Sequence, residues 1–125
     1  MTLLSCEGAA VLAAKGIHPV EMAGYCPSVE NFNAADEAAL RKGDEQMRAL
    51  VAISYDEVAS MLQDIRAGLP KCEINDINGK IAEEGKALGI ATPVNDEVVR
   101  VVTAIQEGKL KPAWKNLRYF DNLIR

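Results

Sequence analysis

Apolar residues recur along this chain at intervals of three and four, the spacing of one face of an α-helix. The stretches with this pattern, and therefore the predicted helices, are residues 3–15, 34–53, 54–68, 73–89 and 95–107. Within the second stretch, the predicted inward positions are Leu40, Met47, Leu50 and Val51. No alternating pattern typical of a strand has a useful length. We therefore predict an all-α fold, a compact bundle of about five or six helices in one domain over residues 1–125.

Several helix boundaries are indicated by residue type. Ser54 followed by Glu57 has the form of a capping box at the start of the third helix. Gly89 stands where a left-handed residue would end the fourth helix. A Thr-Pro step then interrupts the chain, and Asn95 is predicted to be the N-cap of the fifth helix. The tail, residues 109–125, is predicted to add one or two amphipathic turns.

Charge and cysteine content exclude several classes of protein. Eighteen acidic and fourteen basic side chains give a net charge of −4, without the clustered positive surface of a nucleic-acid-binding protein. No run has the length of a transmembrane helix, so we expect no membrane partner. Cys6, Cys26 and Cys72 are odd in number and widely spaced, which fits a reduced, cytoplasmic protein better than a disulfide framework or a zinc site.

The polar residues with a possible role cluster in the third and fourth predicted helices. Ser60 and Asp64 are four residues apart and share a helix face. Glu73 begins the next helix, where the simplest interpretation is a carboxylate that stabilises the helix start. Asn78 is harder to explain, because Asn and Gly79 together cost about 1–1.5 kcal/mol of helix propensity relative to alanines.

Other kinds of site lack support. His18 is isolated, no cysteine has a predicted base nearby, and no cluster has metal-ligand spacing. No glycine-rich phosphate loop follows a strand, so dinucleotide binding of the usual kind is not expected. On spacing alone the chain is a helical domain that binds a partner or a substrate.

An ordered series of motifs adds to this interpretation. The string "SMLQDIRAGLPKCEINDINGKIAEEGKALGIATPVNDEVV" resembles the C-terminal domain of ketopantoate reductases (2-dehydropantoate 2-reductases), a fold similar to the C-terminal domain of 6-phosphogluconate dehydrogenase. The similarity is strongest over residues 58–105. The matching residues are Ser60, Met61, Leu62, Gln63, Asp64, Gly68, Glu73, Ile74, Asn78, Gly79, Gly89, Thr92, Pro93 and Asn95.

This resemblance implies an enzyme of two domains, in which an N-terminal Rossmann domain binds NADPH and the keto-acid substrate lies in the cleft between domains. The enzyme reduces ketopantoate to pantoate on the route to pantothenate and coenzyme A. Ser60 would donate a hydrogen bond to substrate, and Glu73 would be a partner for substrate or for the catalytic lysine. Asp64 and Asn78 would be structural supports that hold the two helices in register.

Three departures from the family pattern limit what this chain can do alone. The family's catalytic lysine begins a Lys-x-x-x-Asn-x-x-x-Asn helix, which has no counterpart here, and we expect no dinucleotide-binding half within these 125 residues. Without a hydride donor site and a proton donor, reduction of a ketone is not possible. Glu57 also stands where the family often has asparagine, and a carboxylate there would repel the carboxylate of ketopantoate.

The leading hypothesis is therefore the substrate-side domain of a ketopantoate reductase-like oxidoreductase, catalytically inactive as this chain. The alternative is an inert, standalone helical module for binding or dimerisation; an unrelated helical structural protein is a third interpretation. We expect exposed apolar surface where the Rossmann domain would dock, and this surface makes a homo-oligomer possible. The preferred keto acid and the role of the tail stay open.

Overall fold

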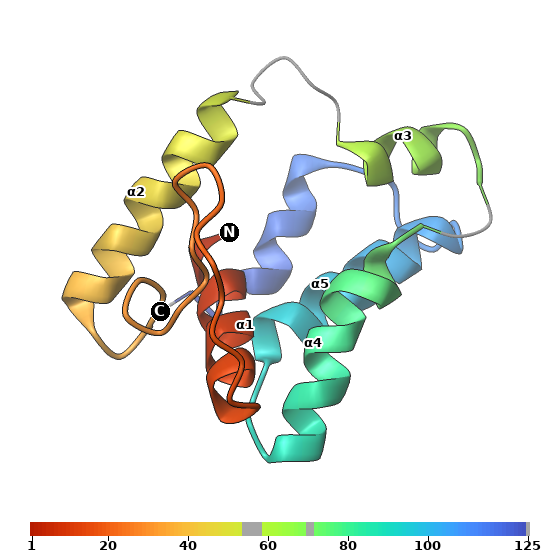
Figure 1. Cartoon of the computed structure of the whole chain (residues 1–125). Helices are drawn as coiled ribbons and strands as arrows, with labels where there is room; N and C mark the ends of the chain where they lie inside the picture. The colour runs from red at the N-terminus through yellow and green to blue at the C-terminus, as the bar shows by residue number, and fades with distance from the viewer. Residues whose placement is uncertain (54–58, 70–71, 125) are drawn as a thin grey trace.

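The computed structural model describes residues 1–53, 59–69 and 72–124, and within them the chain is helical. The elements, in chain order, are α1 (Thr2–Ala14), α2 (Glu37–Ile53), α3 (Ser60–Arg66), α4 (Ile74–Leu88), α5 (Pro93–Gln106) and a 3₁₀ helix, η1 (Trp114–Phe120). Among these residues there is no β-strand, only an isolated bridge between Met22 and Tyr25. The predicted all-α fold is confirmed (Figure 1).

α4 and α5 form a tight helical hairpin beside α1 (Figure 1). Gly89 ends α4 with a φ of 71°, the left-handed conformation that glycine adopts without steric cost, as the sequence predicted. One turn earlier, Gly85 lets the returning chain approach closely. A Cβ there would lie 2.7 Å from Thr92 Cγ2 and 2.9 Å from the Ile90 carbonyl oxygen.

The best-buried cluster lies between α1, α2 and the irregular segment that joins them. It contains Cys6, Ala9, Phe32 and Met47. Phe32 is completely buried and meets the ring of Tyr25 edge to face, with 5.4 Å between centroids. Gly43 of α2 makes room for Phe32, because a Cβ at this position would lie 2.7 Å from Phe32 Cδ1.

Helix boundaries and inward positions differ from the prediction in a few places. α2 begins at Glu37 rather than near residue 34, because Asp36 Oδ1 accepts the backbone N–H groups of Ala38 and Ala39 and so caps the helix. Val51 was predicted to point inward, which is wrong: it is 44% exposed near the end of α2. Asn95 is not the N-cap of α5, which begins two residues earlier.

The capping box predicted at Ser54 and Glu57 lies outside the described residues. After α3 the chain turns at Gly68, which has a φ of 68° and stops the helix as predicted.

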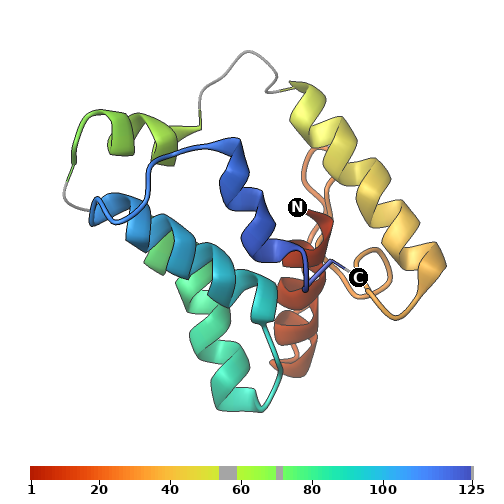
Figure 2. The same cartoon turned by 180° about the vertical axis from the view of Figure 1, so that it is seen from behind.

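η1 leaves the end of α5 and runs back toward α1, so that the C-terminal residues finish beside the start of α2 (Figure 2). Ile124 there lines a small hollow with Leu3 of α1 and Leu40 of α2. The tail thus contains a short 3₁₀ helix, and it leads from the end of α5 to α1 and α2. Within the described residues, no helix is both long and apolar enough to span a membrane.

Candidate functional site

A hydrogen-bond network centred on Asn95 joins α1, α4 and α5. The Glu7 carboxylate of α1 accepts the backbone N–H groups of Val94 and Asn95 at 2.8 and 2.9 Å, and the Asn95 side-chain amide at 2.6 Å. Asn95 Nδ2 also lies 3.3 Å from the Leu4 carbonyl oxygen, and Asn78 Nδ2 of α4 donates to Asn95 Oδ1 at 2.9 Å. Asn95 has no exposed surface, so the network is interior to the three helices.

The network depends on how α5 begins. Pro93 occupies the first helical position and has no N–H, so the first free donors belong to Val94 and Asn95. Thr92 precedes the helix and its side chain forms no capping bond. Glu7 therefore caps α5 from another helix, and its negative charge is placed at the positive end of the helix dipole.

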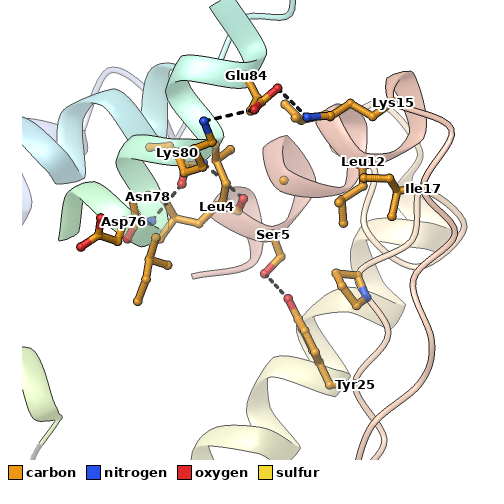
Figure 3. Close-up of a pocket in the computed structure, with 16 residues that line it drawn as sticks. Leu4, Ser5, Leu12, Lys15, Ile17, Tyr25, Asp76, Asn78, Lys80 and Glu84 are labelled. Carbon is orange, nitrogen blue, oxygen red and sulfur yellow. Dashed lines mark hydrogen bonds and ion pairs between the residues drawn. The ribbon is translucent and has the colours of Figure 1, made fainter. Parts of the chain in front are cut away.

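An elongated groove of about 530 Å³ lies beside this network, between α1, α4 and the segment that follows α1 (Figure 3). Its lining residues are Leu4, Ser5, Gly8, Val11, Leu12, Lys15, Ile17, Tyr25, Pro27, Asp76, Ile77, Asn78, Lys80, Ile81, Glu84 and Asn95. The exposed lining of the groove is mainly apolar. The Tyr25 hydroxyl lies 3.2 Å from Ser5 Oγ on one wall.

The two lysines at the rim are paired with glutamates. Glu84 forms ion pairs with Lys15 at 2.6 Å and with Lys80 at 3.3 Å (Figure 3). Hydrogen bonds from Lys15 and then Lys80 hold the pKa of Glu84 below its ordinary value. Hydrogen bonds to Glu83 and Glu84 raise the pKa of Lys80. Both lysines of the lining are therefore engaged, so this groove fits an apolar segment better than a small organic acid.

Comparison with known proteins shows the family of this chain. Residues 1–106 match the family model of the ketopantoate reductase (PanE/ApbA) C-terminal domain, which is most of the sequence. The chain belongs to the ketopantoate reductase family. It is also 37% identical over 90 residues to the 2-dehydropantoate 2-reductase of Aquifex aeolicus (strain VF5), a match that covers 66% of this chain and 28% of that protein. The chain thus spans less than a third of the length of this relative. No solved structure matches the chain.

In this ketopantoate reductase domain, the two residues expected at the substrate lie at helix starts. Ser60 is the first residue of α3 and is exposed. Glu73 immediately precedes α4, is exposed, and its side chain forms no capping bond with the helix. Glu73 thus stands at the start of α4, at its N-cap position, without a side-chain capping bond. Neither residue lines the α1–α4 groove.

The two expected supports behave differently from each other. Asp64 is half-buried on α3, and within the described part of the chain its side chain has no hydrogen-bond partner. Asn78 does support a helix contact, but its partner is Asn95, so it holds α4 to α5 rather than to α3. The glycine beside it has space: the three atoms nearest to a Cβ on Gly79 belong to Asn75 and Ile74 of its own helix, at 3.4 Å or more.

Sequence reasoning missed Glu7, the acceptor that organises the three helices. Its signal was a single carboxylate inside the apolar run of residues 3–15, and Pro93 two residues before Asn95 indicated that the helix begins earlier.

Neither a cysteine nucleophile nor a metal site is indicated among the described residues. The three cysteines are free, and burial, followed by the nearby Glu7 charge, raises the pKa of the Cys6 thiol. Cys6 is thus kept as a thiol and is a poor nucleophile. Among the described residues, no three His, Cys, Asp or Glu side chains could hold a metal ion.

Proposed function

We propose that this domain is the substrate-side half of an NADPH-dependent reductase that converts 2-dehydropantoate, or a closely related 2-keto acid, to the hydroxy acid. The observation that carries the proposal is the family match over residues 1–106, together with the identity to a 2-dehydropantoate 2-reductase. In this proposal the partner is a dinucleotide-binding domain of the same enzyme.

The exposed positions of Ser60 and Glu73 support a role at a domain boundary. Each stands at the N-terminal end of a helix, on surface that another domain can reach. The Ser60 hydroxyl would donate a hydrogen bond to the substrate. Glu73 would accept one from a substrate hydroxyl or orient the lysine that supplies the proton.

The residues present do not fit a dinucleotide. Within the described residues there is no strand followed by a glycine-rich turn and a helix, the arrangement that holds a pyrophosphate. NADPH supplies the hydride of the reaction, and in our proposal another domain binds it. The domain alone is therefore expected to be inactive.

Glu57 affects the choice of substrate. It lies outside the described residues, and its carboxylate would oppose a substrate carboxylate if it faced the cleft. This is why the proposal extends to 2-keto acids other than 2-dehydropantoate.

The test is a chimera in which this domain replaces the corresponding part of the Aquifex aeolicus enzyme, assayed by NADPH oxidation with 2-dehydropantoate. We expect turnover from the chimera and none from the domain alone. Because each lost hydrogen bond to a charged group is worth about 1.5–3 kcal/mol, S60A and E73Q should raise KM for the keto acid about tenfold or more and leave KM for NADPH unchanged.

The matched control is E45Q, which neutralises an exposed glutamate on α2 and should leave both constants unchanged. A chimera that binds NADPH but fails to turn over would contradict the proposal. So would unchanged KM values in both S60A and E73Q.

The alternative is an inert helical binding or dimerisation module. One observation favours it: the groove between α1 and α4 is mainly aliphatic and its rim lysines are already paired. An inactive chimera that binds NADPH normally would favour this module over the reductase.

A further inference from the structure

Charge is divided unevenly along the chain. Residues 107–125 hold five basic and two acidic side chains, whereas residues 1–106 hold nine basic and sixteen acidic ones. The basic segment begins where the family match ends, at residue 106. We call residues 107–125 the basic tail. It carries a charge of about +3 on a domain whose remainder carries about −7.

The basic tail also presents apolar surface. Trp114 is 88% exposed and Leu117 is 59% exposed. Both line a hollow of about 610 Å³ between α5, η1 and α3, together with Val102 and Ile105 of α5. An indole this exposed at the edge of an apolar hollow is typical of a surface that contacts another protein.

Most cations of the basic tail are available for a partner. Within the described residues, Lys111, Lys115 and Arg118 form no ion pair, and only Lys109 is engaged, with Glu107 at 2.6 Å. Arg118 instead lies against the Tyr119 ring.

The segment that follows α1 has the complementary charge. Residues 16–40 contain four acidic side chains and no lysine or arginine, and we call them the acidic segment. The acids are Glu21, Glu30, Asp36 and Glu37, none of which forms an ion pair within the described part of the chain.

The acidic segment also carries apolar side chains on its surface. Val20 is 81% exposed and Met22 is 76% exposed. Reciprocal backbone hydrogen bonds between Met22 and Tyr25 close a tight turn and fix the position of Met22. The molecule that carries the basic, apolar tail thus also carries an acidic segment with exposed apolar side chains.

We propose that the basic tail of one copy docks on the acidic segment of a second copy, and that the reciprocal contact closes a two-fold dimer. A closed dimer satisfies both surfaces of both copies, because each copy offers one of each. A polyanion such as a nucleic acid or an anionic membrane would attract the tail but repel the −7 of residues 1–106. The proposal goes beyond the reductase function and does not depend on it.

The experiment is sedimentation of the 125-residue chain over a range of concentrations. We expect a dimer that 0.5 M NaCl weakens, because unscreened charges contribute to it. W114A, which removes the exposed indole, should also weaken it at least tenfold. K111E/K115E in the tail and E21K/E30K in the acidic segment should each be monomeric, and their equimolar mixture should form a dimer again.

K42E/K86E is the matched control, because it makes the same change in net charge at exposed lysines outside both surfaces. It should still form the dimer. Circular dichroism checks that each variant is folded.

The proposal is overturned by a wild-type chain that stays monomeric at all concentrations, by a dimer that survives both charge reversals, or by a mixture of the reversed variants that stays monomeric. Binding to vesicles of anionic lipid that K111E/K115E abolishes, without any dimer, would instead identify a membrane surface as the occupant.

Discussion

Asn95 shows how a single side chain can connect three helices. Its amide donates to Glu7 and to the Leu4 carbonyl oxygen, while its carbonyl oxygen accepts the Asn78 amide. A fully buried amide that uses both its donor and its acceptor side is stabilising only while all partners are present. The side chain is therefore specified by its neighbours, rather than by helix propensity.

N95A should destabilise the domain by about 1–3 kcal/mol, because it leaves the Glu7 carboxylate and the Asn78 amide without their side-chain partner. The measurement is urea unfolding followed by circular dichroism. N75A is the control, because Asn75 is exposed on α4 and its replacement by alanine favours the helix slightly. Equal stability of the two variants would mean that the network contributes nothing.

At the scale of the element, α4 contains two interior glycines whose surroundings differ. Gly85 is buried where Thr92 and Ile90 cross the helix, whereas Gly79 has no close contact from another element. The first permits the hairpin to close. The second weakens the helix without a packing benefit in this structure.

G85A and G79A should therefore have opposite effects on the free energy of unfolding. G85A should cost about 1–3 kcal/mol, because the new methyl group overlaps the Ile90 carbonyl oxygen and the Thr92 side chain. G79A should gain up to about 1 kcal/mol from helix propensity. Chemical denaturation of both variants measures this, and destabilisation by G79A would show that this face of α4 packs more tightly than described.

α1 and α4 are also joined at the surface by Lys15 and Glu84. The pKa of Glu84 is lowered in the folded state by hydrogen bonds from Lys15 and Lys80, so its contribution to stability is present above its unfolded pKa of about 4.5 and is lost as pH falls through the folded value. Because the pair is at the surface, the effect is small.

E84Q should accordingly be less stable than the parent chain at pH 7, and this difference should shrink as the pH falls below about 4.5. The measurement is the urea midpoint at pH 7 and at pH 3. E45Q is the control, since Glu45 is an exposed carboxylate without an ion pair among the described residues. A difference that stays constant with pH would contradict the assignment.

At the scale of the whole molecule, the pattern of apolar residues was enough to predict a helical chain. α2, α4 and α5 have a clear 3.6-residue period, whereas α1 is apolar on nearly all sides. The prediction was wrong where a residue far away in the sequence determines the local structure. Asn95 has the ordinary properties of an N-cap, but Glu7 takes that role from another helix. Val51 has the helical spacing of an inward residue, but where a helix lies relative to its neighbours is a tertiary property, and position 51 is exposed near the end of α2.

The site was less predictable than the fold. An ordered string of motifs was sufficient to identify the family, because order and spacing are features of the sequence itself. The string could not show that Asn78 contacts α5, that Ser60 and Glu73 are both exposed, or that α1 and α4 line an apolar groove. These depend on contacts between segments far apart in the chain.

The bond from Glu7 to Asn95 joins residues 88 positions apart, and so has a consequence for the order of events during translation. At about 5–20 residues per second, the ribosome adds the second residue about 4–18 s after the first. During this interval the carboxylate has only water as a partner and α1 has no α5 to cap. α1 can therefore pack against α2 before α5 exists, whereas its contact with α5 forms late, and a nascent chain that stalls before Val94 leaves that side of α1 uncovered.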